Sequence, residues 1–301
     1  METNVVKVKL WEANVGYLSW NNRERVAIFE YDPSFLERGW DIAPLTMPIN
    51  ATRSQKQMPW LGNKEEPYRG LPPMIADSLP DKWGNSLFNS WLRDNKISTR
   101  SITPIDHLSF IGSRAMGALE YEPAQKLGDD SPFSVDVQKL YHFAKQVLNE
   151  RESTVLSQEN SILWQDLVKI SSSPGGKRPK AIVALNNVTG EVVSGQGIIP
   201  EGFIHCILKY DDSSVYPYAK LEYVYYKMAI DAGIVMMPSD LRTYEEATHF
   251  LTRRFDRIGN EKIHTQTLAA MSPLSTSYED IFAVIRRLNL PHEDSRQQYL
   301  R

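Results

Sequence analysis

The chain has 301 residues, 34 of them Lys or Arg and 37 Asp or Glu, so its formal charge of −3 argues against a chain-wide electrostatic grip on nucleic acid. Hydrophobic residues at 42% and charged residues at 24% are typical of a globular protein, and the length allows two domains or one two-lobed unit. The single cysteine, Cys206, excludes a disulfide framework or a cysteine-based zinc site and favours a reducing cytoplasm. No uninterrupted apolar stretch reaches about 18 residues, and a strand pattern follows the first residues at once, so we expect neither a membrane span nor a secretory signal.

The first third of the chain begins with strand patterns. Residues 6–10 alternate apolar and polar side chains, and turn residues separate them from further short strands expected at 16–20 and 25–31. This opening predicts an antiparallel meander. Residues 41–73 are rich in Pro, Gly and polar residues and are expected to be loop, whereas residues 82–94 place apolar side chains on one helical face.

A polar tract at 125–134 is the expected linker to the rest of the chain. Periodicity then predicts helices and strands in alternation: helices at 135–152, 219–232 and 281–288, and strands at 181–185, 191–194, 203–210 and 250–256. The helix expected at 219–232 has an apolar stripe made of Leu221, Val224, Met228, Ala229 and Ala232. Gly233 follows it where helices commonly end, and Ser277 with Asp280 forms a capping-box pattern before the last helix.

A basic turn with two adjacent glycines precedes the strands of this second region. Gly175 and Gly176 allow backbone N–H groups to approach an anion closely, and Lys177, Arg178 and Lys180 place positive charge beside them. The turn has neither GxGxxG nor the P-loop pattern. An ordinary basic hairpin loop is therefore the alternative interpretation of the same residues.

Two later residues strengthen the phosphate interpretation. Lys209 lies near the end of an apolar strand pattern, where a cation needs an anionic partner. Glu222 follows 222 − 209 = 13 residues later, in the first turn of the next predicted helix. A strand lysine paired with a helix glutamate, after a glycine turn, is the arrangement with which protein kinases hold ATP phosphates. The alternative is a surface Lys and a surface Glu that never meet.

The sequence resembles the HipA family of toxin kinases in type II toxin–antitoxin systems. The motifs that carry the resemblance in the first third are Val15-Gly16-Tyr17-Leu18, Phe29-Glu30-Tyr31-Asp32, Pro44-Leu45, Met47-Pro48, Ser78-Leu79-Pro80-Asp81 and the run from Ile111 to Leu119. Later in the chain, Gly175-Gly176-Lys177-Arg178-Pro179-Lys180-Ala181 is similar to the family's glycine loop, His205-Cys206-Ile207-Leu208-Lys209 to its ATP-lysine strand, and Arg254-Phe255-Asp256-Arg257 to its hinge signature. The matches keep the family order from Val15 to about His264.

The resemblance implies a set of ATP-binding residues, with Mg²⁺ as the metal in the intact family enzyme. That set is Gly175, Gly176, Lys180, Lys209, Glu222, Arg253 and Phe255. Lys209 is expected to contact the phosphates, and Arg253 and Phe255 to meet adenine through backbone groups; Arg253 stands where the family commonly has Glu. Ser173 falls where the family carries a serine that can be autophosphorylated, with an ordinary turn serine as the alternative.

The resemblance also implies a fold and partners. The expected fold class is α+β, with an antiparallel β-rich N-terminal subdomain at 1–124, a linker and helix at 125–165, a kinase-like N-lobe at 166–257 and the beginning of a helical C-lobe at 258–301. The expected partners are a DNA-binding antitoxin of the HipB type and a protein substrate that carries a target serine. We expect no direct contact with nucleic acid or with a membrane.

The residues that would complete a kinase are not found in the 301 residues. A catalytic Asp needs an Asn five positions later, but five positions after Asp294 of the string His292-Glu293-Asp294 stands Tyr299. We interpret His292 and Asp294 as loop residues, Asp231-Ala232-Gly233 as a helix end rather than a metal motif, and His264 as structural or close to the nucleotide.

No catalytic or metal-binding residue is therefore assigned in this chain. The family resemblance implies that the catalytic base and the metal-binding Asp lie beyond Arg301, the last residue. We expect a truncated, inactive kinase chain, and keep two alternatives open: a non-catalytic partner-binding module, such as a decoy or antitoxin-like subunit, and one half of a split kinase.

Overall fold

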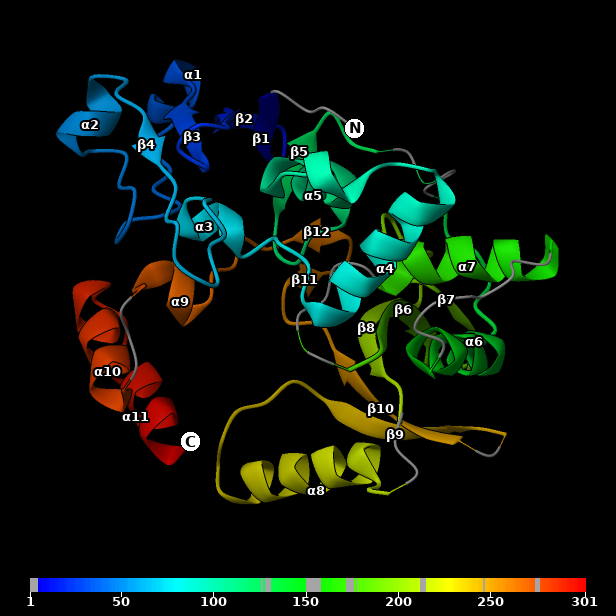
Figure 1. Cartoon of the computed structure of the whole chain (residues 1–301). Helices are drawn as coiled ribbons and strands as arrows, with labels where there is room; N and C mark the ends of the chain where they lie inside the picture. The colour runs from blue at the N-terminus through cyan, green and yellow to red at the C-terminus, as the bar shows by residue number, and fades with distance from the viewer. Residues whose placement is uncertain are drawn as a thin grey trace. The chain divides into compact units, whose positions relative to one another are not determined.

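The computed structural model describes residues 5–125, 127, 131–149, 158–171, 176, 178–211, 215–245, 247–273 and 277–301. These residues form two compact units (Figure 1). Unit 1 comprises 1–79, 96–125 and 262–301, and unit 2 comprises 80–95 and 126–261. The units cross the expected division into consecutive domains, because the helix at 82–94 belongs to unit 2, so the boundaries at 124, 165 and 257 stay predictions.

Unit 1 is built on the predicted antiparallel meander. Its five strands lie in the order β4-β3-β2-β1-β5, and every neighbouring pair is antiparallel. Alternate residues Val6, Val8 and Leu10 of the first strand have no exposed surface, as their period of two requires. The strands are β1 (Val5–Leu10), β2 (Ala13–Asn21), β3 (Val26–Tyr31), β4 (Trp60–Leu61) and β5 (Leu119–Glu122).

The helices of unit 1 that precede β5 were not predicted, and α2 (Thr52–Gln55) and β4 lie within 41–73, which was expected to be loop. The missed helix α5 (Pro104–Ile111) begins at a capping box in which Thr103 donates to Asp106 from its backbone N and its Oγ1, at 2.8 and 2.7 Å. Every residue from Ile105 to Ile111 is buried, including the polar Asp106, His107 and Ser109, so the polar residues of this helix mark no exposed stripe. The other helices before it in unit 1 are α1 (Pro33–Leu36), α2 (Thr52–Gln55), α3 (Pro73–Ala76) and the 3₁₀ turn η1 (Thr99–Ser101), and the 3₁₀ turn η2 (Gly112–Arg114) follows it.

The C-terminal helices of unit 1 confirm one prediction and correct another. Helix α10 (Tyr278–Arg287) starts at the predicted capping box, where Ser277 donates to Asp280 and receives its N–H. The segment that contains His292 and Asp294, expected as loop, is helix α11 (His292–Leu300). The prediction of loop failed because a polar helix lacks an apolar period.

Helix α11 is held by local polar contacts. Its first turn carries an ion pair between Glu293 and Arg296 at 2.8 Å, which supports a helix that has no buried residue. Arg301, the last residue of the sequence, follows as an exposed C-cap. The short helix α9 (Leu268–Met271) precedes α10 and α11 in unit 1.

Unit 2 contains a second antiparallel sheet with the strand order β7-β6-β8-β10-β9. The strands are β6 (Lys180–Asn186), β7 (Val192–Ser194), β8 (Phe203–Lys209), β9 (Ser239–Tyr244) and β10 (Ala247–Arg253). The helices are α4 (Lys82–Asp94), α6 (Val137–Asn149), α7 (Gln158–Ser171) and α8 (Tyr218–Asp231); the short strands β11 (Arg257–Ile258) and β12 (Glu261–Lys262) pair separately. Helix α4 has the predicted bounds, whereas α7 and β9 were missed.

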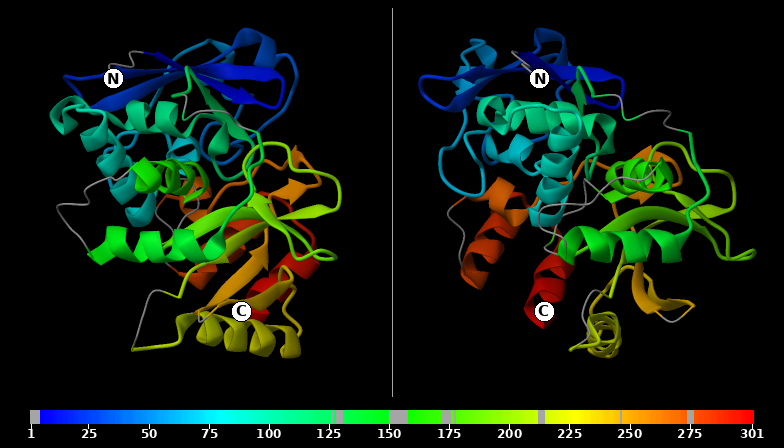
Figure 2. Two further views of the ribbon diagram at one scale, coloured as in Figure 1. Left: turned by 90° about the vertical axis from the view of Figure 1, so that its right-hand side faces the viewer. Right: turned by 45° about the vertical axis from the view of Figure 1, so that its right-hand side comes forward.

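The register of this sheet decides which side chains share a face. Lys180 of β6 lies opposite Lys209 of β8, and Lys209 lies opposite Phe250 of β10, so these three side chains project from one face. Helix α8 packs along β9 and β10 on that face (Figures 1 and 2). Helix α6 covers part of the other face, where the ring of Tyr141 lies 4.7 Å from that of His249.

Two predictions about unit 2 need correction. The strand expected at 250–256 runs from Ala247 to Arg253; the N–H of Arg254 still donates to the carbonyl of His205 on β8 at 2.9 Å, and the chain then bends at Phe255 and Asp256. The apolar stripe expected for α8 is not a buried face: Leu221, Val224 and Met228 are 42%, 52% and 58% exposed. Only Ala219 of this helix is buried. Gly233 ends the helix as predicted, with a φ of +80°.

Burial of His249 should make unit 2 sensitive to acid. Its ring has no exposed surface and its Nδ1 accepts the N–H of Asp211 at 3.2 Å, and burial lowers its pKa to about 4. The unfolded chain binds a proton near pH 6.5, so stability is lost as the pH falls from about 6.5 to 4, by at most about 3 kcal/mol for a shift of this size. We expect urea unfolding of His249→Asn, whose amide oxygen keeps an acceptor, to depend less on pH over this range than that of the wild type. His142→Gln, at an exposed position, is the matched control; equal slopes for all three proteins would contradict the assignment.

Candidate nucleotide-phosphate site

The predicted ion pair between Lys209 and Glu222 is formed. The last residue of β8 donates from its Nζ to Oε2 of the glutamate, which lies in the first turns of α8, at 2.5 Å. The same ammonium lies 5.4 Å from the ring centre of Phe250. The pair therefore joins β8, which is the third strand of this sheet along the chain, to α8, the helix that follows it. Protein kinases pair their ATP-binding lysine and glutamate in the same way.

This ion pair contributes little to folding. Both side chains are 34% exposed, and an ion pair in that position is worth about 0–1 kcal/mol. The ammonium of Lys209 consequently remains reachable for a second anion while the glutamate holds it in place. The arrangement suits ligand binding better than stabilisation of the core.

Asp81 is a site residue that the sequence analysis did not single out. Its Oδ2 accepts a hydrogen bond from Lys180 Nζ at 2.9 Å, and its Oδ1 accepts the N–H of Gly84 at 2.7 Å as the N-cap of α4. Lys180 also donates to the carbonyl oxygen of Gly176 at 2.7 Å. Asp81 thus fixes the lysine that holds the described end of the glycine turn. The N-cap was readable from the motif Ser78-Leu79-Pro80-Asp81, but its partner, 99 residues away, was not.

The environment of Lys180 differs from that of Lys209. Its side chain is 3% exposed, and burial lowers its pKa, an effect that the carboxylate of Asp81 opposes and the nearby charge of Lys209 adds to. Two cations and two carboxylates, Asp81 and Glu222, therefore meet on one face of the sheet with a combined formal charge of zero. A phosphate that approaches them competes with two carboxylates for two ammonium groups.

The glycine turn is described only in part. Gly176 has a φ of +115°, and a Cβ there would lie 3.2 Å from Lys180 Nζ, so the turn needs glycine at this position. Arg178 lies over the ring of Tyr218, the first residue of α8. Gly175 and the phosphorylation candidate Ser173 lie outside the described residues.

The predicted hinge residues lie at the end of β10. The backbone N–H of Arg253 donates to the carbonyl of Pro238 at 3.0 Å, so this N–H is already used within the protein. Its side chain projects from the sheet face opposite that of Lys209, because Arg253 is an odd number of residues from Phe250. Phe255 is 58% exposed. The adenine contacts expected of these two residues remain a prediction, and the Arg253 N–H cannot supply one without leaving Pro238.

The described residues do not supply a magnesium site. No group of three or more His, Cys, Asp or Glu side chains in the described part of the chain is placed to hold a metal ion. Cys206 is buried on the face opposite that of Lys209, and burial raises the pKa of its thiol to about 11, so it cannot act as a thiolate ligand near neutral pH. None of the helices among the described residues is long and apolar enough to cross a membrane.

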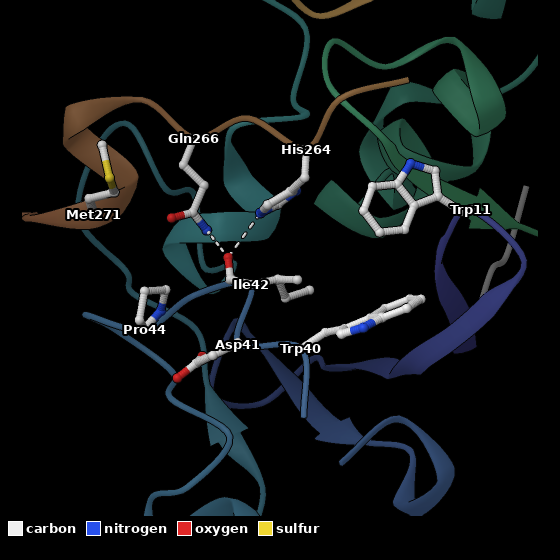
Figure 3. Close-up of a pocket in the computed structure, with 8 residues that line it drawn as sticks. All are labelled: Trp11, Trp40, Asp41, Ile42, Pro44, His264, Gln266 and Met271. Carbon is white, nitrogen blue, oxygen red and sulfur yellow. Dashed lines mark hydrogen bonds between the residues drawn. The ribbon is translucent and has the colours of Figure 1, made fainter. Parts of the chain in front are cut away.

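Unit 1 contains a different kind of pocket, of about 590 Å³ (Figure 3). The rings of Trp11 and Trp40 lie 5.4 Å apart at 81°, and His264 and Gln266 both donate to the carbonyl oxygen of Ile42 at 2.9 Å. The other lining residues are Asp41, Pro44 and Met271. No lysine or arginine is among the described lining residues, so the pocket suits an apolar or aromatic group rather than phosphate. His264 has a structural role here, the first of the two predicted for it.

Two family models match the chain. The HipA N-terminal domain matches residues 6–122, and the HipA-like C-terminal domain matches residues 172–301. The chain belongs to the HipA family. The HipA C-terminal domain match contains Lys180, Lys209 and Glu222, whereas Asp81 lies within the HipA N-terminal match.

The expected truncation is not confirmed by these matches. Both HipA domains are represented in the chain, and the C-terminal match extends to Arg301 itself. The placement of the catalytic base and the metal-binding Asp beyond Arg301 therefore stays a prediction.

A solved HipA structure has the same fold. It belongs to the complex of HipA, HipB and operator DNA from the Shewanella oneidensis MR-1 toxin–antitoxin system, and is similar with a TM-score of 0.60 and 14% sequence identity. The similarity covers 97% of this chain and 67% of that one. No curated protein matches the sequence. The HipA-like α+β fold expected from the sequence is therefore confirmed.

Proposed function

We propose that this HipA-family protein binds ATP with the phosphates at Lys209, as the nucleotide-binding part of a toxin-type serine/threonine kinase. The observation that carries the proposal is the 2.5 Å contact between Lys209 and Glu222 on the face of the sheet that also carries Lys180. In this arrangement the glutamate orients the ammonium and the ammonium neutralises phosphate charge.

The other residues have supporting parts in this proposal. Lys180 holds the glycine turn through the carbonyl of Gly176, and backbone N–H groups of that turn approach the phosphates. Autophosphorylation of Ser173 would add about two negative charges to the same basic turn. Mg²⁺ is the metal expected for ATP, but the described residues offer no cluster of carboxylates for it, so we assign it no ligand.

The proposed partners follow the family. A HipB-like DNA-binding antitoxin is supported by the similar HipA structure, whose complex contains HipB and operator DNA. A protein serine is the proposed substrate class. We propose a reducing cytoplasmic location, for which the single, buried Cys206 is suitable, and no direct contact of this chain with nucleic acid.

The alternative function is that of a non-catalytic module that binds a partner or a nucleotide. The exposed apolar side chains of α8 favour it, because Val224, Tyr225 and Met228 are each more than half exposed. One half of a split kinase would show the same feature. The non-catalytic module would transfer no phosphate, whereas the half of a split kinase would bind ATP and require a second polypeptide for phosphoryl transfer.

These possibilities make one test decisive for activity. We expect the 301-residue polypeptide that ends at Arg301 to incorporate no labelled phosphate into itself or a generic acceptor protein, because no Asp with an Asn five residues later is present in it. Labelled ATP with gel detection measures this, and a HipA kinase known to be active serves as positive control. Robust phosphate incorporation by the wild type would contradict the prediction that this polypeptide is inactive. If Lys209→Met abolished that incorporation, the result would still support ATP binding at Lys209.

A further inference from the structure

The sheet of unit 2 has a second face that the proposed ATP site does not use. Cys206 of β8 lies opposite Arg253 of β10, and both side chains project from the face opposite that of Lys209. Leu251, two residues before Arg253 on β10, lies opposite Asp240 of β9 and therefore shares this face. Charged and apolar side chains from three adjacent strands thus meet on one face of the sheet.

A cavity of about 370 Å³ lies on this face. Ligand-binding pockets in proteins measure about 300–1,000 Å³, so the space suits a small organic molecule. The apolar lining residues are Leu185, Ile204, Cys206, Pro238 and Leu251. Such a lining accommodates an apolar group, which a few convergent polar groups then orient.

Three charged side chains also line the cavity, and two of them are positive. Nη2 of Arg242 lies 3.3 Å from Oδ2 of Asp240, in an ion pair whose side chains are 39% and 54% exposed. Nε of Arg242 is buried and has no hydrogen-bond partner among the described residues. Arg253 forms no ion pair with any residue that the structure describes. Two guanidinium groups and one carboxylate give the charged lining residues a formal charge of +1.

Both guanidinium groups act on the buried thiol of Cys206. Burial raises the pKa of this thiol to about 11, and the charges of Arg253 and Arg242 oppose that rise. The thiol is therefore neutral at pH 7 and leaves the positive charge of the lining uncompensated. An anion that binds over the apolar residues would compensate this charge and could accept from Nε of Arg242.

We infer that this cavity binds a small organic monocarboxylate with an apolar body. Guanidinium groups pair with carboxylate oxygens through parallel hydrogen bonds, and the side chains of Arg242 and Arg253 both supply such donors. A single negative charge matches the formal charge of +1, whereas a phosphate ester carries about −1.5 to −2 at pH 7. The apolar body of the acid would pack on Leu185 and Leu251.

This site is separate from the proposed ATP-phosphate site. Lys209 projects from the other face of the sheet, so its ammonium cannot contact the same anion. The expected adenine contact of Arg253 would use its backbone, whereas the acid would use its side chain. Lys209→Met should therefore keep the wild-type affinity for the acid, and failure of the ATP proposal leaves this inference intact.

Calorimetric titration of the full chain with phenylpropionate at constant ionic strength tests the site. We expect saturable binding, tighter by about tenfold or more than that of phenylpropanol, which lacks the charge, and of propionate, which lacks the ring. Cys206 is the only cysteine, so labelling its Cβ with ¹³C gives one NMR signal that reports on this cavity. That signal should shift saturably with phenylpropionate, at the affinity measured by calorimetry.

Substitutions of the charged residues should change the affinity in opposite directions. Arg253→Met should weaken binding by about tenfold or more, because a charge-assisted contact is lost. Asp240→Asn should strengthen it by up to about fivefold, because Arg242 leaves its ion pair while the acceptor for the N–H of Leu241 is kept. Arg93→Met, at an exposed position outside the lining, is the matched control and should bind like the wild type.

Three results would overturn the inference. They are equal affinity for phenylpropanol, acid binding that is absent or indifferent to Arg253→Met, and a Cys206 signal that phenylpropionate does not move. Weaker binding in Asp240→Asn would contradict the role assigned to Arg242. If Arg253→Met does not fold, the wild type still decides the question through the Cys206 signal and the comparison of acid with alcohol.

Discussion

Replacing Lys209 with methionine should weaken ATP binding by about 10- to 100-fold, the loss expected for a charge-assisted phosphate contact of about 1.5–3 kcal/mol. Methionine keeps the length and apolar stem of the side chain but removes the ammonium that Glu222 holds at 2.5 Å. Calorimetry with Mg-ATP measures the change. Because the ion pair is one-third exposed, unfolding free energy should change by no more than about 1 kcal/mol. A large affinity loss with little stability loss is the signature of a ligand contact.

Lys220→Met is the matched control for this substitution. Lys220 is an exposed lysine two residues before Glu222 on the same helix, so its replacement removes the same charge from the same element. The ATP affinity of this variant should equal that of the wild type. Micromolar ATP binding that is indifferent to the loss of Lys209 would refute the phosphate assignment, and only family membership would then remain.

Replacing Asp81 should have the largest effect on stability. The Lys180–Asp81 pair is nearly buried, with side chains 3% and 14% exposed, and removal of one partner from such a pair costs about 3–5 kcal/mol. Asp81→Asn should lose about 3 kcal/mol, because asparagine is an equally good N-cap for α4 but leaves the ammonium without its carboxylate. Asp81→Ala should lose about 1 kcal/mol more, through the cap. Urea unfolding measures both.

A double substitution separates the ion pair from the cap. Asp81→Asn with Lys180→Met removes both charges, so it should recover much of the stability lost in Asp81→Asn alone. The double variant should bind ATP more weakly than the wild type, because the carbonyl of Gly176 loses its donor. If the stability loss of the double variant equals the sum of the losses of Asp81→Asn and Lys180→Met alone, the two residues do not act as a pair. Asp77→Asn is no substitute as a control, since that carboxylate accepts from Thr267 at the start of α9.

The sequence allowed the elements that carry chemistry to be located, but not all of their contacts. The strand with Lys209 and the helix with Glu222 were found because apolar period and residue type agree there. Helix α5 was missed because it is buried on all sides, and α11 because it is polar on all sides. In neither helix do buried and exposed positions alternate with a period of 3.6 residues, so the hydrophobic pattern does not indicate a helix.

The incorrect predictions have tertiary causes. The apolar stripe of α8 reads as a core face, but the sheet of unit 2 covers little of it, which no local pattern reveals. The strand expected to continue to Asp256 stops at Arg253, because the chain bends at Phe255 and Asp256, where Asp256 forms a buried ion pair with Arg254. Asp81 was quoted for family likeness alone, since an acid 99 residues from its lysine leaves no signal in the spacing.

The double use of Asp81 has a consequence for the order in which the protein assembles. One carboxylate begins a helix and also closes a loop of 99 residues to Lys180, so the glycine turn acquires its support only after the early part of the chain is in place. A polypeptide that starts at residue 126 would contain the whole HipA-like C-terminal match yet leave that lysine's charge uncompensated. The boundary between the two family domains is therefore no place to divide this molecule: its kinase-like half is finished by a residue translated long before it.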